Sequence, residues 1–519
     1  MKNKKFLLYI IIVFTIIVIL SFSAKPTIYS DKLYASPSGK LYLNSSTEPS
    51  SVTKAVYNGI SFGSPSDYSS LPGVVCFRGN NYRNSASYGT AKIKEEKLET
   101  IWSYKIGSLD GWTGVGWNGQ PAIVKWDDSV KKIMNIYAAK KLKSDLKEVI
   151  YGTLDGKVYF LDLEKGDATR SPIKTPGPIK GSVSVDPRGY PLLYVGQGIP
   201  TVHGKTVPIG YRIFSLIDHK MLYFINGIDS FALRKWYAFD STSLLNAKTD
   251  TLIEPGENGI IYVAKMNTTF VPEKKLIKIN PKVKKYRYSG QKSSKRGIEN
   301  SAAIYKNYAY FADNDGLFQC LNLNTLKPVW ARDVTDDTDC TTVLDEEKDK
   351  VFVYTGCEVD HQGKTGKAYI RKINALTGDL VWQTSFDCFY NSKVNGGVFG
   401  TPVIGKNNIS GMIIFSTARC NGPSGGKLSA FNKVTGKKIW ELSFKNYSWS
   451  SPVDVYTPEG KAYIVYCDSA GMMYLIDPKK GKIINRISLG ANIEGSPAVY
   501  ENYVIVGTRG QKIWGVKIN

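Results

Sequence analysis

The sequence predicts an all-β protein, an eight-bladed β-propeller of four-stranded antiparallel blades. One short pattern, a small or polar residue followed by an apolar run, begins eight times from residue 119 onward. Successive starts lie 40 to 68 residues apart, which is the length of a four-stranded blade with loop insertions. The eighth repeat stops at Asn519 after its third strand, and a matching strand is available near the N-terminus. These observations together predict a closed ring.

The first strands set the register of the repeat. Each is followed by β-branched and aromatic runs, which are typical of second and third strands. The starts are Gly119, Gly181, Thr249, Asn300, Cys340, Gly400, Ser450 and Gly495. The second position of these starts holds Gln120, Ser182, Asp250, Ser301, Thr341, Thr401, Ser451 and Ser496.

Tryptophan marks the outer strands. Trp330, Trp382 and Trp440 fall in the fourth strand of their repeats. Trp102 takes the same place in residues 99–107, which precede the first repeat. We expect this N-terminal strand to complete the eighth blade and to leave no open sheet edge.

Residues 1–25 are typical of a membrane anchor or a signal peptide. A basic start precedes an uncharged run from Phe6 to Ala24, and a helix of that length spans roughly 28 Å, close to the thickness of a bilayer core. Residues 21–23 (Ser-Phe-Ser) could serve as a cleavage site, so both alternatives stay open. Either one predicts an exported protein, held at the cell membrane with its C-terminal domain outside or secreted.

The rest of the chain divides into a linker and one domain. Residues 26–72 are rich in Ser, Pro, Gly and Tyr and show no sustained apolar period, so we expect a linker. Residues 73–519 form the propeller.

Composition excludes several classes of protein. Of 519 residues 42% are hydrophobic, which excludes disorder of the whole chain. Three His leave little room for a His-based zinc centre, and seven Cys without a C-x-x-C pair exclude a zinc ribbon.

The formal charge is 68 − 45 = +23, and it gathers in two stretches. Residues 274–296 hold ten basic residues and no acidic one, and residues 131–147 hold six Lys and one Asp. A cationic rim could contact an anionic cell-wall polymer or lipid head groups. The alternative is a solvated, Lys-rich surface. Export argues against nucleic acid as a partner.

The repeat motifs resemble those of the pyrroloquinoline-quinone (PQQ)-like β-propeller family. The shared motifs are small-small-Pro, Y-V/I-G-x-x-D-G and L-D-x-x-T-G-K-x-x-W, and residues 76–89 (CFRGNNYRNSASYG) resemble the F-R-G-[ND] motif that opens the domain. The family includes quinoprotein dehydrogenases, outer-membrane assembly scaffolds and other exported propellers, so the resemblance implies the fold and leaves the activity open.

The resemblance also indicates a branch of the family without dehydrogenase activity. Quinoprotein alcohol dehydrogenases carry two adjacent cysteines, a calcium site and a catalytic Asp. No two cysteines are adjacent here, and no motif matches the calcium ligands or the catalytic Asp. We therefore expect no PQQ and assign no catalytic residue.

Four cysteines hold positions that would bring them together in pairs. Cys340 begins the first strand of its repeat and Cys357 ends the second, so the hairpin between them would place the two side by side. Cys388 and Cys420 hold similar places in the next repeat. Two disulfides are possible in an exported protein, and buried thiols are the alternative.

Acidic residues gather before and after the same repeat. Asp336, Asp337, Asp339 and Asp360 could supply oxygen ligands to Ca²⁺, although their spacing matches no known calcium loop. The alternative is a solvated acidic loop. Paired carboxylates could also serve a glycosidase, but the sequence gives no separation between them.

Aromatic residues gather in the connections that lead into first strands. Trp112, Trp117, Phe399 and Trp449 would rim one mouth of the central channel, where aromatic rings can bind sugars or peptide side chains. The alternative is that these rings pack the blades together. Second strands end nearby at three residues that could supply polar partners: Arg419, Asn421 and Arg509.

These features together predict an extracytoplasmic binding scaffold at the cell envelope. We expect a monomer that contacts the membrane through its N-terminal helix and binds a protein or an anionic polymer. The alternative is an enzyme, either a quinoprotein-type oxidoreductase or a carbohydrate-active propeller.

Overall fold

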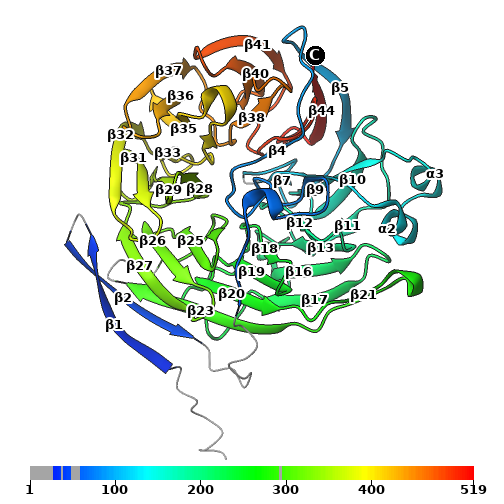
Figure 1. Cartoon of the computed structure of the whole chain (residues 1–519), viewed down its shortest axis with the longest axis horizontal. Helices are drawn as coiled ribbons and strands as arrows, with labels where there is room; N and C mark the ends of the chain where they lie inside the picture. The colour runs from blue at the N-terminus through cyan, green and yellow to red at the C-terminus, as the bar shows by residue number, and fades with distance from the viewer. Residues whose placement is uncertain (1–26, 37–38, 48–58, 118, 291–294) are drawn as a thin grey trace, which may run out of the picture.

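The structure, a computed structural model, describes residues 27–36, 39–47, 59–117, 119–290 and 295–519. In these residues eight sheets of antiparallel strands stand around a central axis (Figure 1), which confirms the predicted fold class. Among the described residues, no helix is both long and apolar enough to cross a membrane. The anchor or signal peptide predicted at 1–25 lies outside the described residues.

Each blade has four strands, which run in order from the channel to the rim. Blades 1 and 2 comprise β8 (Ala122–Lys125), β9 (Lys147–Thr153), β10 (Lys157–Asp162), β11 (Ile173–Lys174), and β12 (Ser184–Val185), β13 (Leu192–Val195), β16 (Gly210–Ser215), β17 (Met221–Asn226). Blades 3 and 4 comprise β18 (Leu244–Asn246), β19 (Thr251–Pro255), β20 (Ile260–Lys265), β23 (Lys282–Gly290), and β24 (Ala303–Tyr305), β25 (Tyr308–Ala312), β26 (Leu317–Asn322), β27 (Lys327–Asp333).

The second half of the ring repeats this order. Blades 5 and 6 comprise β28 (Val343–Glu347), β29 (Lys350–Gly356), β31 (Thr365–Asn374), β32 (Leu380–Phe389), and β34 (Val403–Ile404), β35 (Met412–Asn421), β36 (Gly425–Asn432), β37 (Lys438–Phe444). Blades 7 and 8 comprise β38 (Val453–Tyr456), β39 (Ala462–Cys467), β40 (Met472–Asp477), β41 (Lys482–Ser488), and β42 (Ala498–Tyr500), β43 (Tyr503–Thr508), β44 (Lys512–Ile518), β5 (Leu98–Lys105).

Short elements flank the blades. They are β1 (Thr27–Ser36), β2 (Gly39–Thr47), β3 (Gly73–Val74), β4 (Ser87–Tyr88), β6 (Ser108–Leu109), β7 (Trp112–Thr113), β14 (Thr201–Val202), β15 (Lys205–Thr206), β21 (Thr269–Val271), β22 (Leu276–Lys278), β30 (Glu358–Val359), β33 (Gly396–Gly397), α2 (Asp128–Ile133), α3 (Ala138–Lys141), and the 3-10 turns η2 (Pro65–Asp67), η3 (Pro272–Lys274) and η4 (Asn407–Ile409).

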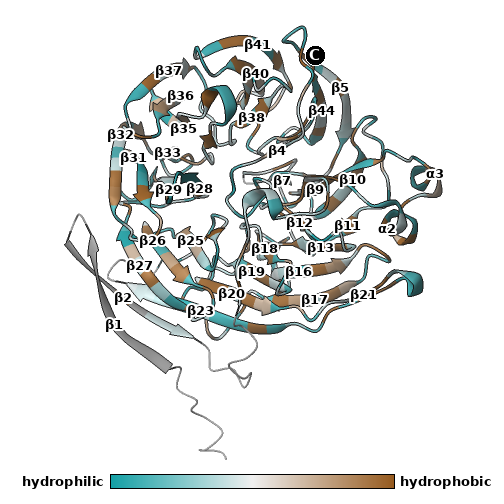
Figure 2. Ribbon diagram, in the orientation of Figure 1, coloured by the Kyte–Doolittle hydropathy of each residue, from teal (hydrophilic) through white to brown (hydrophobic). Residues whose placement is uncertain are grey.

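Burial explains why the inner strands read as continuous apolar runs. Every residue of β9 and β39 is buried, because neighbouring blades cover both faces of these strands. The outer strand β32 instead alternates between half-buried and exposed residues along most of its length. Figure 2 shows the hydrophobic residues concentrated along the strands of the blades.

The N-terminal strand closes the ring as predicted. β5 pairs antiparallel with β44, the last strand of the chain, with Trp102 opposite Gly515. Blade 8 therefore joins the two ends of the domain in one sheet.

The predicted tryptophans dock on the neighbouring blade. Each indole ring lies so close to a glycine of that blade that a Cβ atom, if the glycine had one, would be within 3 Å of the ring. The indole N–H donates to a nearby backbone carbonyl. The pairs of tryptophan and glycine are Trp102–Gly166, Trp330–Gly378, Trp382–Gly436 and Trp440–Gly481.

The second position of the repeat links the blades around the channel. In five pairs of neighbouring blades the backbone N–H at this position donates to the hydroxyl at the same position of the next blade. The pairs are Gln120–Ser182 (2.9 Å), Thr242–Ser301 (2.9 Å), Ser301–Thr341 (3.0 Å), Thr401–Ser451 (3.0 Å) and Ser451–Ser496 (3.1 Å). We call these residues the hydroxyl belt.

The belt corrects the predicted register of blade 3. Its first strand is β18, and Thr242 holds the belt position that the sequence pattern gave to Asp250. The run that begins at Thr249 belongs to the second strand, β19. Asp250 lies in the turn before it and binds Arg188 Nη1 (2.7 Å) and the backbone N–H of Thr268 (2.7 Å).

The described part of the predicted linker packs on the propeller. β2 pairs with β23 and so extends blade 3 by two strands, β2 and β1. Ile60, Phe62 and Leu71 are buried in the same hydrophobic cluster as the inner strands of blades 1 to 5. Residues 27–36, 39–47 and 59–72 are therefore attached to the ring. The apolar residues of these segments are spaced irregularly, so the sequence shows no helical or strand period that would predict their packing.

Residues 73–88, which we call the crossing segment, fill the centre of the ring. The fully buried Arg78 donates to Pro402 O (2.9 Å) and Pro452 O (2.8 Å), at the inner ends of blades 6 and 7. Arg83, also fully buried, donates to Thr242 O (2.6 Å) and Ala302 O (2.9 Å), in blades 3 and 4. Because these blades face one another across the axis, the crossing segment ties opposite sides of the ring together.

Candidate functional site

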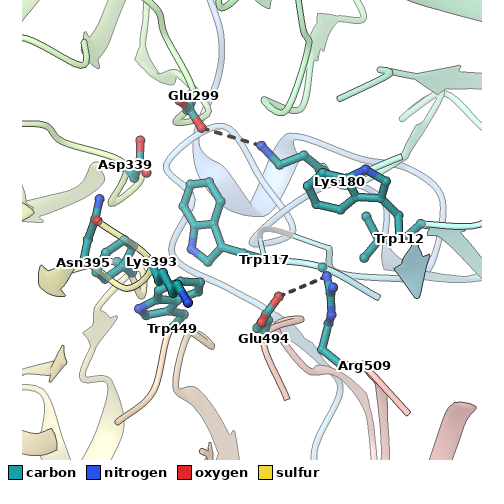
Figure 3. Close-up of a pocket in the computed structure, with 13 residues that line it drawn as sticks. Trp112, Trp117, Lys180, Glu299, Asp339, Lys393, Asn395, Trp449, Glu494 and Arg509 are labelled. Carbon is teal, nitrogen blue, oxygen red and sulfur yellow. Dashed lines mark ion pairs between the residues drawn. The ribbon is translucent and has the colours of Figure 1, made fainter. Parts of the chain in front are cut away.

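A cavity of about 300 Å³ opens at the end of the channel where the first strands begin (Figure 3). Its walls come from loops that lead into first strands of blades 1, 2, 4, 5, 6, 7 and 8, together with the turns that follow β9 and β43. The lining residues are Trp112, Gly116, Trp117, Leu154, Lys180, Glu299, Asp339, Lys393, Asn395, Phe399, Trp449, Glu494 and Arg509. We call it the channel-mouth cavity.

In blades 2 to 8 the repeat presents one side chain per blade to this mouth. The residue two positions before the belt residue of each of these blades lines the cavity or pairs with a residue that lines it. In chain order these residues are Lys180, Asp240, Glu299, Asp339, Phe399, Trp449 and Glu494. The mouth is therefore charged over blades 2 to 5 and aromatic over blades 6 and 7.

The aromatic side is one packed cluster. The Trp117 and Phe399 rings meet edge to face with centroids 6.3 Å apart, and the Phe399 and Trp449 centroids lie 5.0 Å apart. Trp117 is 8% exposed and Phe399 6%, so each presents only part of its ring to the cavity. Figure 3 shows Trp117 near the middle of the mouth, with Trp449 on one side of it and Glu299 on another.

The structure brings five of the seven predicted ligand-binding residues together in the cavity: Trp112, Trp117, Phe399, Trp449 and Arg509. The other two do not line it. Arg419 donates to Pro423 O (2.7 Å) and Val394 O, and Asn421 Nδ2 donates to Phe444 O (3.4 Å). Both side chains hold local backbone in place.

The charged side contains two groups of three carboxylates, all buried except the half-buried Glu299. In each group one oxygen atom from each residue lies within 4.8 Å of the other two. The first trio is Asp240, Glu257 and Glu299, and the second trio is Asp337, Asp339 and Glu358.

The first trio surrounds a lysine of the chain itself. The Lys180 ammonium forms an ion pair with Asp240 and lies 3.9 Å from Glu299 Oε2 (Figure 3). Burial lowers and the surrounding carboxylates raise the pKa of Lys180, and the net shift is upward. This lysine therefore stays protonated and compensates part of the buried negative charge.

The second trio is held by amides. Asn314 Nδ2 donates to both carboxylate oxygens of Asp337 (3.2 Å each), and Asn395 Nδ2 donates to Glu358 Oε2 (3.3 Å). Burial, reinforced by neighbouring carboxylates, raises the pKa of all three carboxyls well above the ordinary values. Asp339 lines the cavity, so this trio could hold a cation that enters from the mouth.

The predicted calcium ligands are only partly brought together. Asp337 and Asp339 meet in the second trio, where Glu358 is the third member. The Asp336 carboxylate instead accepts hydrogen bonds from the backbone N–H groups of Asp360 (3.0 Å) and His361 (3.0 Å). It shapes that loop, and neither Asp336 nor Asp360 belongs to the trio.

All seven cysteines are free thiols in the structure, so neither predicted disulfide is formed. Burial raises the pKa of Cys340 to about 12, which keeps this thiol protonated. Cys420 lies beside Cys388 and raises its pKa, so the second pair was correctly placed together.

The first basic stretch, residues 131–147, is largely neutralised. Lys131 pairs with Asp128 (2.6 Å), and Lys140 and Lys143 both pair with the buried Asp162 (2.8 and 3.1 Å). The predicted cationic surface of blade 1 is therefore weaker than its lysine count indicates. In the described part of the second stretch, three exposed lysines lie around η3 and β22, at Lys274, Lys275 and Lys278, and Lys282 and Lys295 are exposed as well.

Sequence reasoning missed Lys180, Glu299, Glu494 and the trio members Asp240 and Glu257. The belt register could have revealed Lys180, Asp240, Glu299 and Glu494, because each stands two residues before a belt position. Glu257 and Glu358 hold equivalent places, since each stands two residues after the end of a second strand, β19 or β29.

Comparisons with known proteins bear on the class of this fold. Residues 424–519 match the family described as outer membrane protein assembly factor BamB, one of the PQQ-type repeat families. No curated protein matches the chain.

Solved structures share the fold. BamB from Moraxella catarrhalis has 15% sequence identity and a TM-score of 0.51, over 81% of this chain and 99% of that one. A quinohemoprotein alcohol dehydrogenase from Pseudomonas putida has 13% identity and a TM-score of 0.57, over 86% and 80%. The one from Comamonas testosteroni has 11% identity and a TM-score of 0.59, over 89% and 83%. At these identities the likeness concerns the fold.

The protein is thus a closed eight-bladed propeller with a partly aromatic, partly acidic cavity at one channel mouth. The predicted resemblance to the PQQ-like propeller family is confirmed by the family match at residues 424–519 and by the shared fold.

Proposed function

We propose that this protein is an extracytoplasmic binding scaffold at the cell envelope, and that its ligand binds in the channel-mouth cavity. The apolar N-terminal run and the likeness to an outer membrane assembly factor support the location. The anchor and the monomeric state are parts of the same proposal.

The cavity carries the proposal. Aromatic rings on one side and carboxylates on the other offer apolar contact and charge in a concave site, which is the usual composition of a binding pocket. The partner is a protein or another envelope component. The exposed lysines around η3 and β22 supply a second, weaker contact with an anionic polymer.

The composition of the cavity argues against the quinoprotein alternative. Pyrroloquinoline quinone is itself a polycarboxylate, and Glu299, Asp339 and Glu494 would face it at close range. Of the cavity's cations, Lys180 pairs with Asp240, Arg509 lies 3.5 Å from Glu494 Oε2, and Lys393 is exposed. The Asn395 amide already donates to the second trio. These residues do not fit the cofactor, and we derive no step through it.

A double variant tests the binding role of the cavity. We expect Trp117→Ala/Trp449→Ala to lose about 90% of the envelope components that the full-length chain captures, because hot-spot aromatics dominate binding energy. The measurement is quantitative capture from detergent-solubilised envelopes, with circular dichroism as a check on folding.

The matched control is Trp236→Ala, since Trp236 is 38% exposed and does not line the cavity. This control should capture as much as the parent chain. Equal capture by a folded Trp117→Ala/Trp449→Ala variant would contradict the proposed site.

A further inference from the structure

The two carboxylate trios make an internal comparison. Each gathers three acidic groups at the same mouth, all buried except the half-buried Glu299, and buried carboxylates require compensation by opposite charge or by protons. The chain compensates the first trio with the Lys180 ammonium. Among the described residues, no Lys, Arg or His forms an ion pair with Asp337, Asp339 or Glu358.

The second trio has unmet acceptor capacity. Asp339 Oδ1 and Glu358 Oε1 are buried and receive no hydrogen bond from an N–H donor or a hydroxyl. These two carboxyls lie close enough to share a proton, and that proton compensates part of their buried negative charge. Asp339 is only 9% exposed, yet it lines the channel-mouth cavity, so a cation in the cavity can reach it.

The geometry points to a specific kind of cation: we propose that the second trio binds a primary alkylammonium group whose alkyl part packs against Trp117, Phe399 and Trp449. This inference rests on the proposed function of the cavity and names the chemistry of its ligand. The source is a lysine side chain of a partner polypeptide or a free alkylamine.

The choice of an ammonium follows from the donors that it offers. An ammonium carries three N–H donors on one compact charge, which matches three carboxylates around one point. With one oxygen atom from each carboxylate, the trio supplies three of the six to eight oxygen ligands that Ca²⁺ takes. A cavity of about 300 Å³ is at the small end of ligand sites and suits one long side chain or one small amine.

The raised pKa values of the trio add a readout. For each of the three carboxyls burial is the largest cause of the raised pKa, and nearby carboxylates raise it further. For Asp337 these are Asp339, Glu299 and Asp360. For Asp339 they are Glu299 and Asp240, and for Glu358 they are Asp339 and Asp337. Lys180 acts in the opposite direction on Asp339. An arriving ammonium displaces the protons that the trio holds, so binding releases protons and tightens as the pH rises.

Isothermal titration calorimetry on the full-length chain in non-ionic detergent tests the proposal. The probes are N-acetyl-lysine methylamide, a short Ala-Lys-Ala peptide and butylamine. The matched controls are N-acetyl-norleucine methylamide and butanol, which keep the alkyl part without the charge, and CaCl₂ is a separate arm. We expect the amines to bind at least about tenfold more tightly than their neutral controls.

Two isosteric variants locate the charge. We expect Asp339→Asn and Glu358→Gln each to weaken amine binding about tenfold, because each removes one charged acceptor. Asp387→Asn removes the same charge from a side chain that is 84% exposed, and it should bind like the parent chain. Proton release, seen as a difference in binding enthalpy between two buffers, should shrink in both trio variants.

If the peptide binds more tightly than butylamine, the source of the ammonium group is a lysine of a polypeptide. If the two bind equally, the source is a free amine. Equal binding of the lysine and norleucine amides would overturn the inference and leave the proposed function standing, since the aromatic wall would then bind alone. Binding of Ca²⁺ that depends on Asp339 and Glu358, without amine binding, would make the trio a metal site. The absence of binding by every amine to the folded parent chain would also overturn it.

Discussion

The Trp102→Ala variant is expected to unfold with a free energy about 3–5 kcal/mol below that of the parent chain. Trp102 is 9% exposed and packs between Gly166 of blade 1 and Gly515 of β44. Its indole N–H donates to Leu163 O (2.9 Å). The substitution therefore opens a cavity at the one seam where the two ends of the domain meet.

Chemical denaturation followed by tryptophan fluorescence measures this effect. Trp236→Ala removes a half-exposed ring outside the seam and should change stability by less than about 1 kcal/mol. If Trp102→Ala were as stable as this control, β5 would not be the strand that closes the ring.

The second large effect is expected from Arg83→Ala, which should also lower the free energy of unfolding by about 3–5 kcal/mol. The Arg83 guanidinium donates to Phe77 O, Thr242 O and Ala302 O at 2.6 to 2.9 Å and is fully buried. Its removal leaves three buried carbonyls without this donor and frees the crossing segment from blades 3 and 4.

Arg486→Ala is the matched control, because Arg486 is exposed on β41. It should unfold like the parent chain within about 0.5 kcal/mol. Limited proteolysis gives a second readout: cleavage within residues 73–88 should appear in Arg83→Ala and not in the control. Resistance of that segment in the variant would show that the ring holds it without Arg83.

The number of blades and the closure could be predicted from sequence because both depend on local patterns. A tryptophan in four of the outer strands and a repeat of blade length identify the units, and the eighth repeat reaches Asn519 one strand short. Blade 3 was placed one strand late, because the run after Thr249 is as apolar as a first strand. The hydrogen bond from Thr242 to Ser301, which joins residues 59 apart, distinguishes the two.

The site could be predicted less completely than the fold. The aromatic residues at the mouth stand out because Trp is rare and Gly-rich loops surround it. The acidic trios do not, since their members lie far apart in the sequence. The first joins Asp240 and Glu257 of blade 3 to Glu299 of blade 4, and the second joins Asp337 and Asp339 to Glu358 across the first two strands of blade 5. The distribution of charge could not be predicted either: although the net charge is +23, four of the six lysines of residues 131–147 form ion pairs with carboxylates of blade 1.

Site-specific photo-crosslinking tests the central claim, that the channel mouth is where this scaffold binds its ligand. A photo-reactive phenylalanine analogue replaces Lys393, an exposed residue of the cavity lining, or Lys479, an exposed residue in the turn between β40 and β41. We expect crosslinks to envelope components from position 393 and none from position 479. The crosslinks from position 393 should disappear in the Trp117→Ala/Trp449→Ala variant. Equal crosslinking from both positions, or from position 393 regardless of the two tryptophans, would contradict the account.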